Sequence, residues 1–329
     1  MHAAESTVRA AGMDRHALRS ESTAPAAVVY CSGSQNLRRT SMGSRIRDHR
    51  FSDPPRPGAA FAGGEEPLPA RFRSRSSFLR AGLRLLILLA SLCVAAARFF
   101  ILRQRYGSRL ELEQRARWLH ETCSLVLRSL GVEVNCCGTR PTQGLIVSNH
   151  LSYLDIPAFA AATPCVFVAK REVRNWPVFG FFARCGGTIF IDRRSRASTD
   201  AVAQQMIDVL GKGVSVLLFP EGTSTDGTSV LRFHPSLLQP AITLGNPIVA
   251  AAIGYRMAGA EERDLCYYGD VRFGPHLLQL LGRAGVLAAI DFHPDSEIYA
   301  DRKGAAQSLR EKVIALRRRM RHAGADGDE

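Results

Sequence analysis

A histidine and an aspartate, His150 and Asp155, have residue types and a spacing that favour acid–base chemistry. On one continuous helix they would be separated by about 140° and would point to different faces. They can meet if His150 lies on a turn after a strand and the helix begins at Ser152. The Asp155 carboxylate would then accept a hydrogen bond from Nδ1–H of His150. That arrangement leaves Nε2 free to take a proton, as in sites where a base and its orienting group activate a nucleophile.

The same residues also have a purely structural interpretation. Ser152-x-x-Asp155 is the pattern of a capping box at the start of a helix. A single histidine beside such a turn can be an ordinary polar surface residue. The spacing alone therefore leaves both interpretations open.

Three arginines, Arg193, Arg194 and Arg196, follow the apolar stretch 188–191. Arginine makes paired, charge-assisted hydrogen bonds to phosphate, and ligands of open α/β sheets bind outside the carboxyl ends of the strands. An anion-binding site is therefore one interpretation of this cluster. A solvated basic loop is the other.

A second polar turn, Glu221-Gly222-Thr223, follows the apolar stretch 214–219. Glycine allows a backbone to approach a ligand closely. The Glu221 carboxylate can accept a hydrogen bond from a substrate hydroxyl or hold a facing arginine. An ordinary turn is the structural alternative.

Short apolar stretches alternate with amphipathic ones after residue 137, and this alternation is typical of a sheet with helices packed on it. We therefore predict an α/β domain with a mixed, largely parallel sheet flanked by helices. The predicted strands are 145–147, 165–168, 188–191, 214–219, 248–253, 271–273 and 286–292, and the predicted helices are 198–210 and 305–321.

The most hydrophobic segment precedes this domain. Residues 85–97 carry no charge, and the run extends to 102 if the Arg98 side chain reaches outward. A helix over 85–102 would cover about 27 Å of a hydrocarbon core that is about 30 Å thick. The segment is bracketed by arginines in positions typical of headgroup anchors: Arg80, Arg84, Arg98 and Arg103. We predict a bilayer-embedded helix, with a buried core helix as the alternative.

An amphipathic helix is predicted next, over 108–130, because apolar residues recur there at helical spacing before Gly131. The predicted α/β domain is thus preceded by an N-terminal hydrophobic helix and an amphipathic helix. The predicted division of the chain is a disordered Arg/Ser/Pro-rich extension over 1–78, a membrane-associated helical segment over 79–137, the α/β domain over 138–322 and a disordered tail over 323–329.

The composition limits the classes of partner and of site that this chain is expected to have. The 329 residues carry a formal net charge of +13, and all but four of the 43 basic residues are arginines. Nucleic acid, acidic lipid and phosphorylated substrates are therefore the expected classes of partner. The eight cysteines form no C-x-x-C pair, which argues against a zinc ribbon or a thioredoxin-type site. The motifs of serine hydrolases, zinc proteases and P-loop or Rossmann nucleotide-binding proteins are also missing.

Four motif segments and a linking stretch between the first and the second, in this order, resemble the glycerolipid acyltransferase family, which includes bacterial 1-acylglycerol-3-phosphate acyltransferases. His150 to Asp155 resembles the H-x4-D motif of that family. The other matching segments are the linking stretch 167–170, the second motif 187–193, the third motif 219–223 and the fourth motif 247–249.

The resemblance implies roles for individual residues. His150 would be the catalytic base and Asp155 its orienting partner, as the spacing also suggests. Arg193 would face the acceptor phosphate, with Lys170 beside it. The turn Glu221-Gly222-Thr223 would bind the acceptor, and Asn149 is also expected at the substrate.

The expected reaction transfers a fatty acyl group from acyl-CoA or acyl carrier protein to the free hydroxyl of a lysophospholipid. The first expectation for the acceptor is 1-acylglycerol-3-phosphate, which would give phosphatidic acid. Two departures from the family pattern, Phe233-His234 in place of Phe-Lys and Ala250 in place of a second proline, keep another acceptor open, such as lyso-ornithine lipid. No metal or redox cofactor is implied.

The expected location is the cytoplasmic face of the inner (cell) membrane. The acceptor is a membrane lipid, thioester donors are cytoplasmic, and arginines are attracted to an anionic membrane surface.

Two functions of other classes are alternatives. A nucleic-acid-binding protein would explain the net charge, but the arginines are spread along the chain and accompany no recognised binding motif, so no nucleic-acid partner is expected. A non-catalytic lipid-binding relative is the other. The presence of both His150 and Asp155 argues against it.

Overall fold

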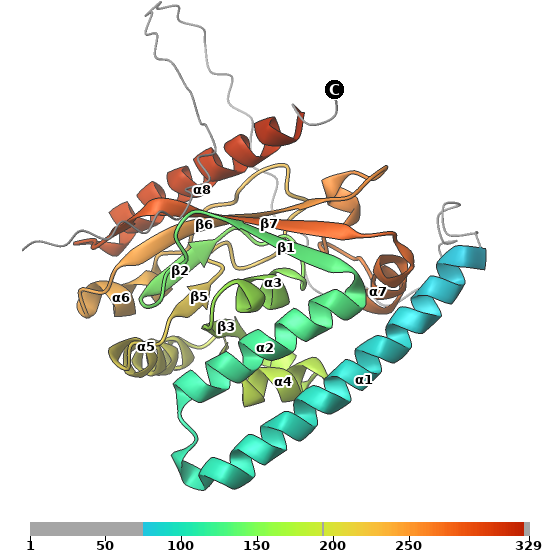
Figure 1. Cartoon of the computed structure of the whole chain (residues 1–329). Coiled ribbons are helices and arrows are strands. Elements are labelled where there is room, and N and C mark those ends of the chain that lie inside the picture. Colours follow the sequence, from blue (N-terminus) through green and yellow to red (C-terminus); the bar gives the residue numbers. More distant parts are fainter. Residues whose placement is uncertain (1–74, 193, 326–329) are drawn as a thin grey trace, which may run out of the picture. The chain divides into compact units, whose positions relative to one another are not determined.

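The computed structural model describes residues 75–192 and 194–325. Within this part of the chain, seven strands form one sheet in the order β1-β7-β6-β2-β5-β3-β4 (Figure 1). The strands are β1 Val132–Cys137, β2 Leu145–Ser148, β3 Val166–Lys170, β4 Ile189–Ile191, β5 Val216–Leu218, β6 Ile248–Arg256 and β7 Val286–Glu297.

The sheet is mixed and largely parallel, as predicted. In the described chain every neighbouring pair of strands is parallel except β6 and β7, which are antiparallel. The central strands β2 and β5 are buried along their whole length. This explains why they appear in the sequence as uninterrupted apolar runs rather than as alternating ones.

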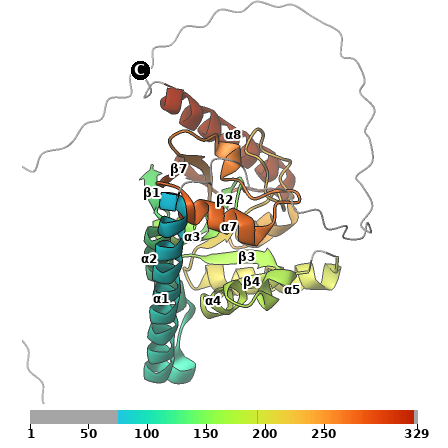
Figure 2. The ribbon, with the colours of Figure 1, turned by 90° about the vertical axis from the view of Figure 1, so that its right-hand side faces the viewer.

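Helices cover both faces of the sheet (Figures 1 and 2). The buried apolar residues of α1, α3 and α7, and those of α2 except Ala116, form one hydrophobic cluster with the strands. Those of α5, α6 and α8 form a second. The helices are α1 Arg75–Tyr106, α2 Leu112–Leu130, α3 Asp155–Ala162, α4 Phe179–Cys185, α5 Arg196–Gly211, α6 Gln239–Thr243, α7 Phe273–Gly282 and α8 Arg302–Ala325. Short 3₁₀ helices lie at Gly107–Arg109, Arg171–Asn175, Ser236–Leu238 and Glu262–Asp264.

Helix α1 is long and apolar enough to cross a membrane, and 22% of its most apolar stretch is buried against the rest of the chain. It runs antiparallel to α2 (Figures 1 and 2). The indole Nε1 of Trp118 donates to the Ala95 carbonyl at 3.0 Å, and Phe99 packs on the same ring. Large apolar side chains remain exposed on the other side of α1: Phe78, Leu79, Leu83, Leu86, Ile87, Leu89, Val94, Phe100 and Ile101.

Three of the four arginines expected to anchor α1 to headgroups have partners inside the protein. Arg80 and Arg84 donate to carbonyl groups at the C-terminal end of α7, where a helix leaves acceptors unpaired. Arg98 forms an ion pair with Glu121 of α2. These arginines therefore hold α1 against the domain, in addition to any contact that they make with lipid.

The amphipathic helix α2 has clear boundary signals. Glu111 is its N-cap and forms a capping box with Gln114, so the helix begins at Leu112 rather than at 108. It ends where predicted, because Gly131 adopts the left-handed conformation (φ 71°) that closes many helices.

The predicted strand at 271–273 is wrong, because Phe273 is the first residue of helix α7. Pro275 lacks an N–H group and therefore fits the first turn of a helix, and Leu277, Leu280 and Leu281 repeat at helical spacing. The short alternation before them resembles a strand only locally.

Three segment boundaries differ from the predicted ones. Strand β1, Val132–Cys137, pairs with β7 and so belongs to the sheet, although the predicted domain began after it. Helix α8 continues to Ala325, which includes 323–325 of the predicted tail. Residues 75–78 lie in α1, and the rest of the predicted N-terminal extension lies outside the described residues.

Candidate functional site

The candidate site lies at the carboxyl ends of three neighbouring parallel strands, β6, β2 and β5. His150 follows the end of β2, and Phe219 follows the end of β5. This is the edge at which open α/β sheets bind their ligands.

His150 and Asp155 meet as the spacing predicted. Nδ1 of His150 lies 2.7 Å from Oδ2 of Asp155. The aspartate side chain is fully buried, whereas 21% of the histidine side chain is exposed. The arrangement fixes one ring nitrogen against a carboxylate and leaves the ring accessible from outside.

The capping box that Ser152 and Asp155 might have formed is only half present. Oδ2 of Asp155 accepts hydrogen bonds from the backbone N–H groups of Leu151 (2.6 Å) and Ser152 (3.1 Å). Oγ of Ser152, however, is buried and has no hydrogen-bond partner in the described chain. The helix α3 begins at Asp155 itself, so His150 lies on the preceding turn.

Tyr255 on β6 is a further residue of this site, and sequence reasoning missed it. Its hydroxyl donates to Oδ1 of Asp155 at 2.5 Å, and its side chain is buried. Burial, and then the Asp155 charge, raise the pKa of Tyr255 well above its ordinary value, so the phenol stays protonated and donates. Four donors therefore converge on one carboxylate.

Replacing Tyr255 with phenylalanine is expected to lower the free energy of unfolding by about 1–3 kcal/mol, because a buried acceptor loses its partner. The loss of kcat should be smaller than for removal of the Asp155 charge, because Oδ2 still holds His150. Thermal unfolding in detergent and steady-state kinetics measure the two effects. Wild-type stability in this variant would contradict the assigned contact.

Glu221 and Asn149 hold the backbone around His150 through their side chains. Oε1 of Glu221 accepts from the N–H of His150 at 2.8 Å, and Oε2 accepts from Leu231 at 2.7 Å. Burial raises the pKa of the Glu221 carboxyl, although these N–H donors oppose the rise. The Asn149 amide exchanges two hydrogen bonds with the backbone of Ile253. Direct contact of these two side chains with a substrate stays a prediction.

Phe219 stacks on the His150 ring with a centroid separation of 4.2 Å and an interplanar angle of 16°. The N–H of Thr225 donates to the carbonyl of His150 at 2.9 Å. Gly222 lies at φ 78°, a conformation that glycine adopts without strain, and Thr223 is exposed beside it. The turn after β5 thus surrounds the histidine on two sides.

A cavity of about 270 Å³ adjoins this turn. Its lining residues are Ile191, Thr199, Leu218, Phe219, Pro220, Gly222, His234, Ser236 and Leu237. Phe219 therefore contacts both His150 and the cavity. His234, which stands where many phosphate-acceptor enzymes have lysine, lines the cavity.

Of the predicted anion-binding residues, Lys170 lies beside a residue of the cavity lining. Lys170 is exposed at the end of β3 and pairs in register with Ile191, a cavity residue. Arg193 follows two positions after Ile191 but lies outside the described residues. Among its neighbours, Arg171 forms an exposed ion pair with Asp192 at 3.3 Å.

An aromatic cluster flanks the His150 turn on its other side. The ring of Tyr153 contacts the rings of Phe179, Tyr267, Phe273 and His276. The Tyr153 hydroxyl lies 2.9 Å from Nδ1 of His276. Because the N–H of Tyr267 also donates to the Leu151 carbonyl, this cluster is tied to the turn that carries His150.

Acidification is expected to destabilise the protein through His276. Burial, with a smaller contribution from Arg283, lowers the pKa of His276 to about 4 from its ordinary 6.5. The unfolded chain therefore binds the proton more tightly, and stability falls as the pH drops from about 7 to 4. The difference corresponds to about 3 kcal/mol.

A His276→Asn variant tests this expectation, because asparagine keeps an acceptor for Tyr153 and does not titrate. The free energy of unfolding is measured against pH for both proteins. The wild type should lose stability relative to the variant between pH 7 and pH 4. A constant difference between the two curves would contradict it.

Comparisons with known proteins identify the family of this chain. The family described as Acyltransferase matches residues 133–254. The chain is 34% identical to a lyso-ornithine lipid O-acyltransferase of Rhodobacter capsulatus, covering 76% of this chain and 94% of that protein. It is 37% identical to a lyso-ornithine lipid O-acyltransferase of Pseudomonas aeruginosa, covering 50% of this chain and 62% of that protein. It is 30% identical to a 1-acyl-sn-glycerol-3-phosphate acyltransferase of Neisseria gonorrhoeae, covering 59% of this chain and 77% of that protein.

The fold also has a solved counterpart. The crystal structure of the 1-acyl-sn-glycerophosphate acyltransferase PlsC from Thermotoga maritima matches with a TM-score of 0.56 at 19% identity, covering 74% of this chain and 96% of that one. The family match and the relatives identify the class of protein as an acyltransferase. The chain belongs to the acyltransferase family that includes lysophospholipid acyltransferases.

Proposed function

We propose that this chain is a lysolipid O-acyltransferase that uses His150 as its general base. The observation that carries the proposal is the His150–Asp155 pair. Nδ1 of His150 lies against a fully buried carboxylate, and the ring is partly exposed at the carboxyl edge of the sheet. Membership of the acyltransferase family supplies the reaction class.

In the proposed step, Nε2 of His150 takes the proton of the acceptor hydroxyl as its oxygen attacks the thioester carbonyl. The C–O bond forms, the C–S bond breaks, and the proton passes from His150 to the departing thiolate. Asp155 holds the ring in the correct tautomer and stabilises the imidazolium. The acyl donor is acyl-CoA or acyl carrier protein, and the enzyme itself forms no covalent intermediate.

The cavity beside Phe219 is the proposed place for the acceptor headgroup. Phe219 lines this cavity and stacks on the His150 ring, so a hydroxyl bound there would lie near the base. Lys170 and Arg193 are proposed to meet the anionic part of the headgroup, which holds the hydroxyl for attack. Glu221 and Asn149 contribute indirectly, by fixing the backbone of His150.

The exposed apolar side of α1 supports action at a membrane, where a lysolipid acceptor resides. A bilayer is the environment in which those side chains are stable. The proposed location is the cytoplasmic face of the inner membrane, because thioester donors are found in the cytoplasm.

Lyso-ornithine lipid is the acceptor that we propose first, and 1-acylglycerol-3-phosphate second. The relative with the widest coverage reported above is a lyso-ornithine lipid O-acyltransferase, and 94% of its length is covered. The described lining of the cavity contains His234 but no lysine or arginine. His234 stands in the place of the lysine of many phosphate-acceptor enzymes, and this departure also favours an acceptor other than 1-acylglycerol-3-phosphate.

The experiment presents both acceptors together to purified protein in mixed micelles, with acyl-CoA or acyl carrier protein as the donor. Mass spectrometry measures the two diacylated products. An excess of ornithine lipid among the products would support lyso-ornithine lipid as the acceptor. An excess of phosphatidic acid would make 1-acylglycerol-3-phosphate the acceptor instead. Failure to acylate either acceptor with either donor would overturn the proposed function.

A further inference from the structure

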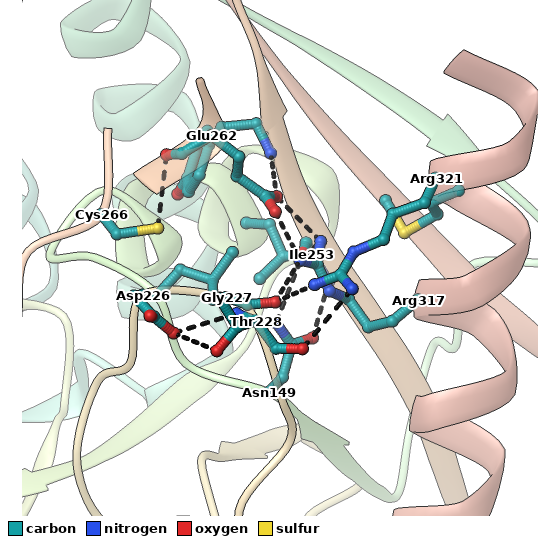
Figure 3. A network of polar contacts seen from close by, with 12 residues as sticks. Asn149, Asp226, Gly227, Thr228, Ile253, Glu262, Cys266, Arg317 and Arg321 are labelled. Carbon is teal, nitrogen blue, oxygen red and sulfur yellow. Dashed lines mark hydrogen bonds and ion pairs between the residues drawn. The ribbon is translucent and has the colours of Figure 1, made fainter. Parts of the chain in front are cut away.

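The C-terminal helix α8 carries a buried arginine, Arg317, whose side chain is only 6% exposed. It forms an ion pair with Glu262 through two hydrogen bonds, of 2.6 and 2.9 Å (Figure 3). The same guanidinium donates to the carbonyls of Ile253 at 2.9 Å and of Gly227 at 3.2 Å. Arginine suits this position because its planar fork offers several donors in fixed directions.

The first contact leads to the residue before His150. The Ile253 carbonyl accepts from Arg317 and also from the Asn149 side chain, at 3.0 Å. The N–H of Ile253 donates back to Asn149 at 2.9 Å. Arg317 and Asn149 therefore share one carbonyl group, as Figure 3 shows.

The second contact leads to the carbonyl of His150 itself. The N–H of Gly227 donates to Oγ1 of Thr225 at 3.3 Å, and the N–H of Thr225 donates to the His150 carbonyl at 2.9 Å. Arg321, one turn further along α8, also binds the Gly227 carbonyl. The loop after β5 is thus held against α8 on one side and against His150 on the other.

The third contact leads to Asp155. Oε1 of Glu262 accepts from the N–H of Tyr255 at 2.9 Å as well as from Arg317. The Tyr255 hydroxyl donates to Asp155. Both members of the proposed catalytic pair are therefore reached from one guanidinium.

We propose that Arg317, with Glu262, is a positioning residue that sets the geometry of the His150–Asp155 pair from α8. This inference rests on the proposed function of that pair. None of the residues in these three contacts lines the cavity beside Phe219. A displacement of about 1 Å in a catalytic group can cost about 100-fold in rate, so loosening the contacts should act on the chemical step.

The test variant is the double substitution Arg317→Met with Glu262→Gln, which removes both charges together. Glutamine keeps an acceptor for the N–H of Tyr255. The matched control is Arg319→Met with Asp291→Asn on the same helix. Arg319 binds the buried Asp291 of β7 at 2.6 Å, so this pair joins α8 to a different strand from the one that carries Ile253 and Tyr255.

The expected result, measured below the unfolding temperature of each full-length variant, is a kcat about 10- to 100-fold lower for the Arg317 variant, with KM changed by less than about threefold. The control should keep kcat close to wild type. Hydrogen exchange should accelerate at 149–155 in the Arg317 variant and not in the control.

Equal kcat losses in the two variants, with wild-type exchange at 149–155, would overturn the inference. The exchange measurement needs no substrate, so it tests the coupling even if neither lysolipid is acylated and the proposed function fails.

Gly254→Ala is a second variant in case the double substitution does not fold. A Cβ there would lie 2.4 Å from Nη1 of Arg317, so the guanidinium must shift while every charge remains. It should reproduce the lower kcat and the faster exchange at 149–155, and wild-type values for both would also overturn the inference.

Discussion

Replacing His150 with alanine is expected to lower kcat for acyl transfer by about 10²- to 10⁴-fold, the usual contribution of a positioned general base. The variant loses the only group in the proposed step that removes the hydroxyl proton. The fold should survive, because Glu221 binds the backbone N–H of residue 150 and not its side chain. Steady-state kinetics with a thioester and a lysolipid measure the effect.

His293 offers a matched control for that variant. It is 20% exposed, close to the 21% of His150, and it also has an aspartate beside it, Asp295 at 3.8 Å. His293→Ala should keep kcat near the wild-type value. A His150→Ala protein that is folded and as active as His293→Ala would show that the histidine is not the base.

Replacing Asp155 with asparagine is expected to lower kcat by a similar factor, about 10²- to 10⁴-fold, with only a moderate loss of stability. The amide oxygen can occupy the Oδ2 position and keep the bonds from Leu151 and Ser152. The amide nitrogen then faces Tyr255, whose hydroxyl oxygen can accept. The substitution thus removes the charge that stabilises the imidazolium while it preserves most contacts.

Asp291→Asn is the matched control for Asp155, because Asp291 is another buried carboxylate, on β7, and it binds Arg319 instead of a histidine. Unfolding measurements should show stability losses in both variants, and kinetics should show the large kcat loss only in Asp155→Asn. If Asp155→Asn retained wild-type kcat, the orienting role of the carboxylate would be rejected.

The pairing of His150 with Asp155 was predictable from the sequence because it is local. Whether the two side chains meet depends on the end of one strand, the turn after it and the first residue of a helix. These features all lie within a few residues of one another. The sheet was predictable for a similar reason, since buried strands such as β2 and β5 are continuous apolar runs.

The partners of that pair were not predictable, because they depend on strand order. Tyr255 reaches Asp155 only because β6 lies beside β2, 100 positions away in sequence. The role of Glu221 also required the structure. A carboxylate next to a glycine turn can face a ligand or the backbone, and here both oxygens face backbone N–H groups.

The apolar helix α1 is another element whose partners could not be predicted from local sequence. Its length and composition predicted a membrane helix, and the exposed apolar side chains agree with that expectation. Its arginines were interpreted as headgroup anchors, but Arg84 binds carbonyls at the end of α7. Those carbonyls come from residues about 200 positions further along the chain, so no local pattern could reveal them.

The most direct test of the account follows a labelled acyl chain. Purified wild-type protein and His150→Ala are incubated with an isotopically labelled acyl thioester and lyso-ornithine lipid or 1-acylglycerol-3-phosphate, and mass spectrometry measures where the label goes. The account predicts that wild-type protein places the label in a diacyl lipid, with one thiol released for each acyl group transferred, and that the variant forms almost none. Equal diacyl lipid from both proteins, or label found only as free fatty acid, would contradict it.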